Sequence, residues 1–164
     1  MSLKLNLGTT FALIFLVTTV MVMPAAAAPT DACALLTQAQ VTAAVGVSVG
    51  AGTHVNQTFT RTCTWTPATP GEVKAVTLNL QTAQEYDGGK AKLEKMKPLM
   101  PNPPKTTAVS GFGDDAYFLE FTNIASLFVK KGNEAFKLVI YGAMPAPKAE
   151  GALKTLATQV LSSY

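Results

Sequence analysis

Residues 109–117, VSGFGDDAY, combine two glycines with two adjacent aspartates, a composition found in both phosphate-binding and metal-binding loops. A phosphate loop needs a third glycine and a helix N-terminus after it, whereas the aromatic residues that follow Asp115 predict a strand. A calcium site needs six or more oxygens from a spaced acidic loop, whereas Asp114 and Asp115 are adjacent and would point to opposite faces of a strand. We therefore expect a tight turn, in which glycine supplies backbone freedom and an aspartate caps backbone N–H groups.

His54 is the only histidine of the chain, so a two-histidine metal site cannot form within it. It could act as a base for Ser110 or Ser126, or together with Asp114 or Asp115, but nothing in the sequence places these residues side by side. The acidic residues are scattered along the chain. The sequence therefore predicts no catalytic residue, no metal ligand and no cofactor, while a hydrolase that uses the acidic residues of the 110–115 turn stays open as an alternative.

Cys33 and Cys63 are the two cysteines of the chain. An even number of cysteines in an exported protein predicts a disulfide, and two cysteines allow a single intramolecular pairing. A cross-link that closes a loop of roughly 30 residues is expected to stabilise the fold by about 3–4 kcal/mol. The spacing is not C-x-x-C, so a structural disulfide is favoured over a redox pair.

The N-terminus predicts export. Lys4 precedes an uncharged apolar run, Leu7–Met23, which is followed by the small residues Ala25–Ala28. Cleavage after Ala27 satisfies the A-x-A rule and would release residues 28–164 as a single α+β domain, soluble in the periplasm or outside the cell. The alternative is a retained anchor, since the apolar run is near the lower length limit for crossing a bilayer, but its alanine-rich exit favours cleavage.

The remaining chain alternates between helix and strand patterns. Thr37 and Gln40 have the spacing of a capping box that opens a helix over 38–45. In the strand Thr62–Thr66, Cys63 and Trp65 share one face and are expected to point into the core. The predicted elements are, in order, helix 31–46, strands 62–66 and 73–81, helix 83–96 with a break near Gly88-Gly89, loop 98–107, strands 115–122, 125–131 and 134–142, and helix 148–162, with an extra short strand near 54–59. The apolar stripe of the last helix follows the i, i+3, i+4, i+7 rule and consists of Ala149, Leu153, Leu156, Ala157, Val160 and Tyr164.

The last predicted strand carries apolar residues on both faces. Phe136, Leu138 and Ile140 alternate with Val139 and Tyr141. A sheet with one solvated face would alternate between apolar and polar residues. Either helices cover both faces or one face is an open apolar binding surface, and the three predicted helices favour coverage.

Four segments in this order carry a resemblance to a known family: DACALLTQAQVTAAVG, CTW, VSGFGDDAYF and an alanine-rich C-terminal helix. The chain resembles small exported bacterial domains of unknown function, many of them lipoproteins. The resemblance implies a PsbP-like α/β/α sandwich with a mainly antiparallel sheet of about five to six strands flanked by three helices. It implies no catalytic residues, and the chain departs from the family in lacking a lipobox.

A non-enzymatic binding or accessory module for a protein partner or a small apolar ligand is the function that these features favour. The candidate ligand or partner surface is formed by Phe112, Phe118, Phe128 and Tyr141. The formal charge of +3 is too small to favour nucleic acid as a partner. We expect a monomer whose only membrane contact is through the export signal, with a structural surface protein as a further alternative.

Five lysines form the one concentration of charge in the chain. They could contact an anionic surface such as a membrane. Glu85, Asp87 and Glu94 are interspersed among them, which favours a solvated helix face instead. The five lysines are Lys90, Lys92, Lys95, Lys97 and Lys105.

Overall fold

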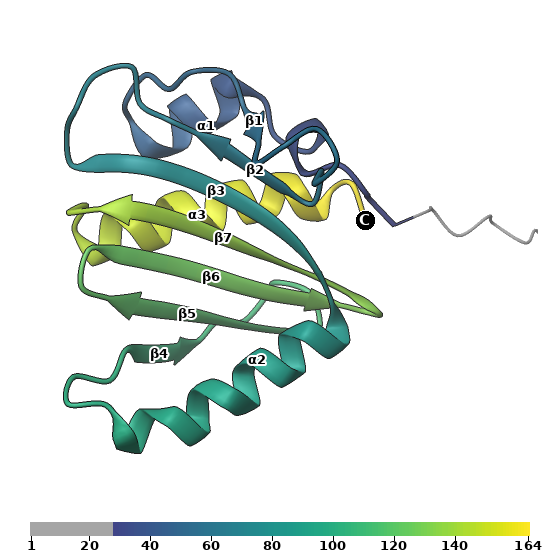
Figure 1. The fold of residues 1–164 in the computed structure, drawn as a ribbon, viewed down its shortest axis with the longest axis vertical. Helices are drawn as coiled ribbons and strands as arrows, with labels where there is room; N and C mark the ends of the chain where they lie inside the picture. Colours follow the sequence, from purple (N-terminus) through teal and green to yellow (C-terminus); the bar gives the residue numbers. More distant parts are fainter. Residues whose placement is uncertain (1–27) are drawn as a thin grey trace, which may run out of the picture.

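A seven-stranded antiparallel sheet forms the centre of the computed structural model, which describes residues 28–164 (Figure 1). The predicted export signal, residues 1–27, lies outside the described residues. The strand order of the sheet is β1-β2-β3-β7-β6-β5-β4. The strands are β1 (Thr53–His54), β2 (Thr62–Trp65), β3 (Val73–Thr82), β4 (Lys105–Ala108), β5 (Asp115–Phe121), β6 (Ile124–Lys131) and β7 (Glu134–Gly142).

Three α-helices and two 3-10 helices accompany the sheet. These are η1 (Ala32–Ala34), α1 (Gln38–Val45), α2 (Ala83–Met96), η2 (Lys97–Leu99) and α3 (Ala146–Leu161). The predicted α+β class, the antiparallel sheet and the three helices are confirmed. The strand number is a correction, since the sheet has seven strands where five to six were expected.

The extra strand is β4, which lies in a segment predicted to be a loop. Its residues, Lys105–Ala108, pair antiparallel with β5, from Lys105 opposite Glu120 to Ala108 opposite Tyr117. β4 is an edge strand of four residues with no apolar alternation, so it is held by backbone pairing more than by side-chain burial. A prediction based on hydrophobic periodicity cannot detect such a strand.

One face of the sheet, which we call the core face, carries the main hydrophobic core. Cys63 lies opposite Leu78, and Leu78 lies opposite Leu138, so these side chains share that face. Cys63 and Trp65 are both fully buried, as the alternation in β2 predicts. The helices α1 and α3 cover this face and also contact each other.

The apolar stripe predicted for the C-terminal helix is confirmed. α3 begins at Ala146, two residues earlier than expected, with Pro145 as its N-cap. Five positions of the predicted stripe are fully buried: Ala149, Leu153, Leu156, Ala157 and Val160. The Thr37–Gln40 capping box at the start of α1 is also present.

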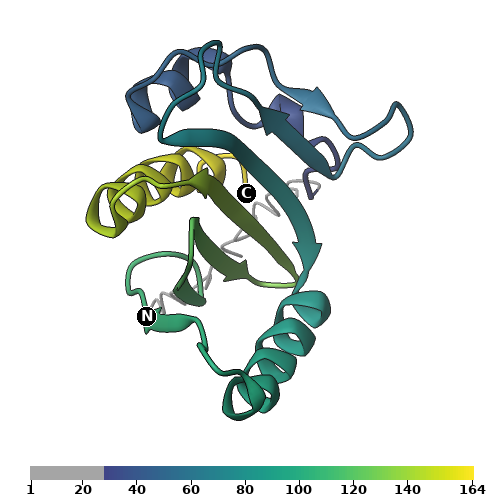
Figure 2. The same ribbon diagram turned by 60° about the vertical axis from the view of Figure 1, so that its left-hand side comes forward.

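The opposite face of the sheet, which we call the α2 face, is covered in part by α2. Figures 1 and 2 show α2 and α3 on opposite sides of the sheet. The expected break at Gly88-Gly89 does not occur, and α2 runs unbroken from Ala83 to Met96. A capping box formed by Thr82 and Glu85 starts the helix, and the buried ring of Tyr86 attaches it to the sheet.

Coverage of the α2 face is incomplete. Tyr141 on β7 and Phe121 on β5 share this face and remain 38% and 45% exposed. The three-layer arrangement favoured by the sequence therefore exists over one part of the sheet, and exposed apolar side chains remain at one end of it. No helix within residues 28–164 is long and apolar enough to cross a membrane.

Candidate functional site

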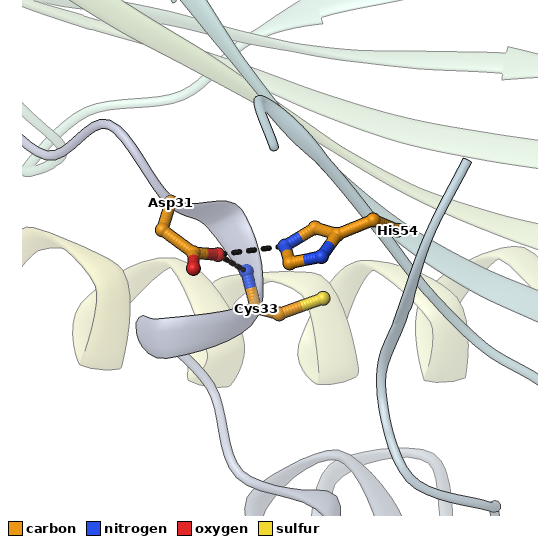
Figure 3. Close-up of side chains that lie close together, drawn as sticks. All are labelled: Asp31, Cys33 and His54. Atoms are coloured by element: carbon orange, nitrogen blue, oxygen red, sulfur yellow. Dashed lines mark hydrogen bonds and ion pairs between the residues drawn. The ribbon is translucent and has the colours of Figure 1, made fainter. Parts of the chain in front are cut away.

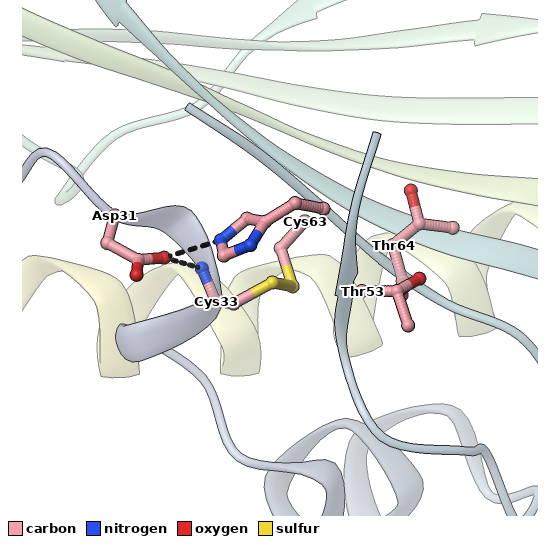
Figure 4. Close-up of a disulfide and its surroundings, with 6 residues drawn as sticks. Asp31, Cys33, Thr53, Cys63 and Thr64 are labelled. Carbon is pink, nitrogen blue, oxygen red and sulfur yellow. Dashed lines mark hydrogen bonds and ion pairs between the residues drawn. A yellow bond between two sulfur atoms is a disulfide. The ribbon is translucent and has the colours of Figure 1, made fainter. Parts of the chain in front are cut away.

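The disulfide Cys33–Cys63 joins η1 to β2 and confirms the predicted pairing (Figure 4). The two Cα atoms are 5.0 Å apart. Gly52 packs directly against the bridge, because a Cβ atom there would lie 2.6 Å from Cys63 Sγ and 2.8 Å from Trp65 Nε1. The disulfide, Trp65 and the bare glycine backbone together close one end of the core.

Asp31 and His54 are joined by a hydrogen bond beside this disulfide (Figure 3). The His54 Nε2 atom lies 2.8 Å from Asp31 Oδ1, which also accepts a hydrogen bond of 2.8 Å from the Cys33 backbone N–H. The hydrogen bond from His54, followed by the one from Cys33, holds the pKa of Asp31 below its usual value. Asp31 thus caps η1 and connects β1 to it.

Asp31, Cys33 and His54 also satisfy the spacing of a three-residue metal site. The ligand that metals bind is the thiolate, and the Cys33 sulfur is engaged in the disulfide. Asp31 and His54 leave two ligands, fewer than the three or four protein ligands of a zinc site. The arrangement is explained by capping and by attachment of β1.

His54 and the residues proposed as its catalytic partners lie far apart. His54 is on β1, at one edge of the sheet, whereas Asp115 begins β5, next to the other edge. Five strand spacings separate β1 from β5, which corresponds to roughly 24 Å along the sheet. Ser126 is buried on β6, four strand spacings from the β1 strand that carries His54. The hydrolase alternative therefore has no assembled pair of groups at the 110–115 turn.

Residues 46–50, GVSVG, match the G-x-S-x-G pattern of hydrolase nucleophile elbows in sequence but not in structure. Such an elbow is a sharp turn from a strand into a helix. Here Gly46 ends α1 in the left-handed conformation, and Ser48 follows in an exposed loop. No hydrogen bond joins the Ser48 hydroxyl to His54 in the part of the chain that the structure describes.

The VSGFGDDAY turn fastens β5 to the hairpin between β6 and β7. Gly113 has a φ of 57°, and a side chain there would collide with the Lys130 carbonyl. The Asp114 N–H donates to that carbonyl over 2.8 Å, and Asp114 Oδ2 accepts a 2.6 Å bond from the Gly132 N–H. The expected turn, with glycine at a restricted position and an aspartate cap, is confirmed.

Aromatic rings and lysines meet beneath α2. The rings of Tyr117 and Phe128 stack with centroids 4.6 Å apart, and Tyr86 from α2 meets Tyr117 edge-on at 5.6 Å. Lys90 Nζ lies 5.5 Å from the Tyr117 ring centroid and 2.6 Å from Asp115 Oδ2. This cluster holds α2 onto the sheet.

The ionisation of this cluster is shifted by burial and by charge pairing. Burial, reinforced by the nearby Asp115 carboxylate, raises the pKa of Tyr117 to about 12 and that of Tyr86 still further. The hydrogen bond from Lys90 lowers the pKa of Asp115. At neutral pH both tyrosines are therefore neutral and Asp115 is ionised, which is the pattern of a structural ion pair.

A pocket of about 640 Å³ opens at the end of the sheet where β5 turns into β6 and β7 leads into α3. Four separate parts of the chain surround it: the 102–105 segment, the 120–125 turn, the end of β7 and the start of α3. Its apolar lining consists of Pro103, Phe121, Ile124, Ala125, Ile140, Ala143, Met144, Pro145, Ala146 and Ala149. Its polar lining consists mainly of Asn102, Lys105, Glu120, Thr122 and Asn123.

This pocket has the size of a small-molecule binding site, and polar and apolar groups contribute about equally to its surface. Ligand sites commonly measure roughly 300–1,000 Å³ and combine an apolar lining with a few polar groups. Lys105 and Glu120 are cross-strand partners at its rim. Among residues 28–164, Lys105 and Glu120 are the charged residues that line it. The geometry suits binding of a small molecule.

The four aromatic residues predicted as a ligand surface do not form one surface. Phe118 is a correction: it points to the core face, is 4% exposed and belongs to the main core. Phe112 is half-buried against the same core. Phe128 and Tyr141 do share the α2 face, but Phe128 is stacked on Tyr117. Only Tyr141 remains largely accessible.

Phe121 and Ile124, which line the pocket, were missed by the sequence analysis. The signal that could have indicated them is the pair of apolar residues on either side of a short turn, Thr122-Asn123. Asn123 has a φ of 58°, which marks the tight turn between β5 and β6.

A scan against protein-family models and searches of curated proteins and of solved structures found no match.

Proposed function

We propose that this chain is an exported, non-enzymatic binding module whose pocket at the β5–β6 turn holds the apolar part of a small ligand. The observation that carries the proposal is the pocket itself, about 640 Å³ with a mixed lining of apolar and polar side chains. Asn102 and Asn123 at the rim can hydrogen-bond a polar end group of the ligand. Binding of this kind requires only a pocket of suitable shape, apolar contacts and these polar rim groups.

Export is part of the same proposal. The disulfide Cys33–Cys63 supports it, because structural disulfides persist in oxidising compartments. The antiparallel sheet with helices on both faces is compatible with a PsbP-like sandwich and with membership of the family of small exported bacterial domains. Both assignments remain proposals.

The two alternatives are less well supported. A hydrolase would need His54 near Asp114 or Asp115, and Asp114 instead caps the Gly132 N–H. A self-associating structural protein could pair through its sheet edges, but the edge strands β1 and β4 have two and four residues. Short edges limit pairing between chains. Light scattering at several concentrations tests this alternative, since it predicts a mass that rises with concentration.

Filling the pocket tests the proposed function. Ala146 lies at the pocket, at the first residue of α3, and Ala146→Trp is expected to weaken binding of a fluorescent fatty acid by at least about tenfold. Ala91→Trp, on the exposed side of α2, is the matched control and should bind like the unmodified protein. Equal binding by all three proteins, or no binding by any apolar probe, would contradict the proposal.

A further inference from the structure

The segment Lys92–Lys105, which we call the tip, exposes apolar side chains at the end of α2. Leu99 is 83% exposed and Met96 is 40% exposed, and both stand at the junction of α2, η2 and the following loop. A single exposed leucine is ordinary on a protein surface. Here two large apolar side chains lie three residues apart on a projecting turn.

The tip is held in this shape by its own contacts. Lys97 Nζ lies 2.6 Å from Glu94 Oε1 and donates a 2.5 Å hydrogen bond to Thr106 Oγ1 on β4. The Met100 N–H donates to the Lys97 carbonyl over 3.1 Å. These contacts connect α2 to β4 while leaving Leu99 outside. The exposure of Leu99 is therefore a property of an ordered turn.

Unpaired positive charge surrounds the exposed residues. Lys92, Lys95 and Lys105 are exposed and take part in no ion pair within residues 28–164. The nearby carboxylates are those of Glu94, which is paired with Lys97, and Glu120, which lies opposite Lys105 in the β4–β5 ladder. The tip thus combines exposed apolar groups with net positive charge.

A second exposed apolar loop in the same molecule lacks this charge. Val55 and Phe59 are 66% and 46% exposed in the loop between β1 and β2. The nearest cation in that segment, Arg61, is paired with Glu85 over 3.1 Å. The loop between β1 and β2 thus exposes apolar side chains without free lysines nearby, whereas the tip combines the two.

We propose that the tip docks on an anionic lipid bilayer. Apolar side chains that enter the boundary between headgroups and acyl chains, with lysines level with the phosphates, are the chemistry of peripheral membrane binding. Leu99 and Met96 supply the first part, and Lys92, Lys95 and Lys105 supply the second. The proposal goes beyond the proposed ligand binding and does not depend on it.

Docking through the tip would also place the pocket close to the lipid surface. Pro103 and Lys105 belong to the tip and line the pocket, and Phe121 extends the exposed apolar area beside them. The expectation that membrane contact is limited to the export signal is therefore replaced by a proposal of contact through the folded domain.

Vesicle sedimentation tests the docking proposal. Residues 28–164 contain every described strand and helix and both hydrophobic clusters, so this part can be used without the N-terminal apolar run. We expect it to sediment with vesicles of equal parts phosphatidylglycerol and phosphatidylcholine, and not with phosphatidylcholine alone. Added salt should weaken this binding, because it screens the lysines.

Two variants of the tip should reduce this binding. Leu99→Asp is expected to lower it at least about tenfold, because a leucine side chain no longer leaves water. The triple variant Lys92→Ala, Lys95→Ala and Lys105→Ala should lower it about a hundredfold, at roughly fivefold per lysine. Both variants change exposed side chains, and an unchanged circular dichroism spectrum verifies that they fold.

Matched controls change the same residue types elsewhere. Val55→Asp and the triple variant Lys74→Ala, Lys131→Ala and Lys154→Ala should each stay within about threefold of the unmodified protein. As an independent readout, the emission of Leu99→Trp should shift to shorter wavelength with phosphatidylglycerol vesicles, whereas that of Val55→Trp should not. Trp65 is buried and contributes a constant background.

Three outcomes would overturn the docking proposal. They are an absence of phosphatidylglycerol-dependent sedimentation, an equal loss of binding in the tip and control variants, and an unshifted emission of Leu99→Trp. The pocket variant Ala146→Trp keeps the tip intact and should sediment like the unmodified protein. Failure of ligand binding and failure of docking are thereby distinguished.

Discussion

The two faces of the sheet are covered by different kinds of side-chain packing. On the core face, α1 and α3 enclose aliphatic side chains and Trp65, and the disulfide closes one end. On the α2 face, one helix is held by the rings of Tyr86 and Tyr117 with lysines and carboxylates around them. The first face is buried over most of its length and opens only at the pocket, whereas the second is only partly covered.

This difference indicates that the core face mainly provides stability, whereas the less covered regions are available for binding. Dense aliphatic packing makes the core face intolerant of change. The polar surroundings of the α2 face and the exposed tip leave residues free to contact other molecules. The pocket opens at the end of the sheet, where the core-face residues Ala125 and Ile140 help to line it. Because the same strands supply both faces, one sheet provides a rigid support and a surface for binding.

Paired truncations on the two faces should reveal the largest contrast. Trp65→Ala removes a fully buried ring from the core face and is expected to lower the free energy of unfolding by about 3–5 kcal/mol. Phe128→Ala removes a half-buried ring from the α2 face and should lower it by about 1–2 kcal/mol. Urea unfolding followed by circular dichroism measures both, and equal losses would remove the distinction between the faces.

Loss of the disulfide should be almost as damaging. The bridge closes a separation of 30 residues, and the double variant Cys33→Ala and Cys63→Ala is expected to lose about 3–4 kcal/mol. Urea unfolding with and without reductant gives the same comparison in the unmodified chain. A bridge-free protein of unchanged stability would show that the core face does not rely on its cross-link.

The parts of the fold that could be predicted are those where side-chain burial follows a period. Alternation in β2, β3 and β7 and the stripe of α3 located these elements, and cysteine number gave the disulfide. Gly88-Gly89 suggested a break because each glycine weakens a helix. The helix continues because the capping box and the Tyr86 ring fix it, and ring contacts across the sheet cannot be seen from local sequence.

The candidate site was mostly beyond prediction for the same reason. The pocket is assembled from four segments that are far apart in the chain, and only the topology brings them together. Phe118 was predicted to lie on a surface because β5 carries aromatic residues on both of its faces. Only the pairing register, which places Phe118 opposite Leu127, shows that its face is the buried one. GVSVG is the reverse case, in which a sequence pattern is present but the strand-to-helix turn that would make it a nucleophile elbow is absent.

Acid titration should sharpen the comparison on the α2 face. The pKa of Asp115 is lowered by its hydrogen bond with Lys90, so its contribution is present above the unfolded value of 3.8 and is lost as pH falls through the lower folded value. The pair is partly exposed, so the effect should stay below about 1 kcal/mol. Asp115→Asn should lose less stability than the unmodified protein between about pH 4 and pH 2.

Urea midpoints at several pH values measure this difference. Asp31→Asn applies the same test beside the disulfide, where His54 lowers the pKa of Asp31. If Asp115→Asn and the unmodified protein lose stability in parallel as the pH falls, the Lys90–Asp115 pair does not hold α2 in place.

The smallest effect is expected for Tyr86→Phe. The Tyr86 hydroxyl is buried and has no hydrogen-bond partner among the described residues, so its removal breaks no bond and relieves a desolvated polar group. We expect the free energy of unfolding to stay the same or to rise by up to about 1 kcal/mol, whereas Tyr86→Ala, which removes the ring, should lower it by about 3 kcal/mol. Urea unfolding measures both variants. A loss of more than about 1 kcal/mol in Tyr86→Phe would mean that the hydroxyl bonds to the nearby Asp115 carboxylate in solution, and that polar contacts hold α2 as much as the rings do.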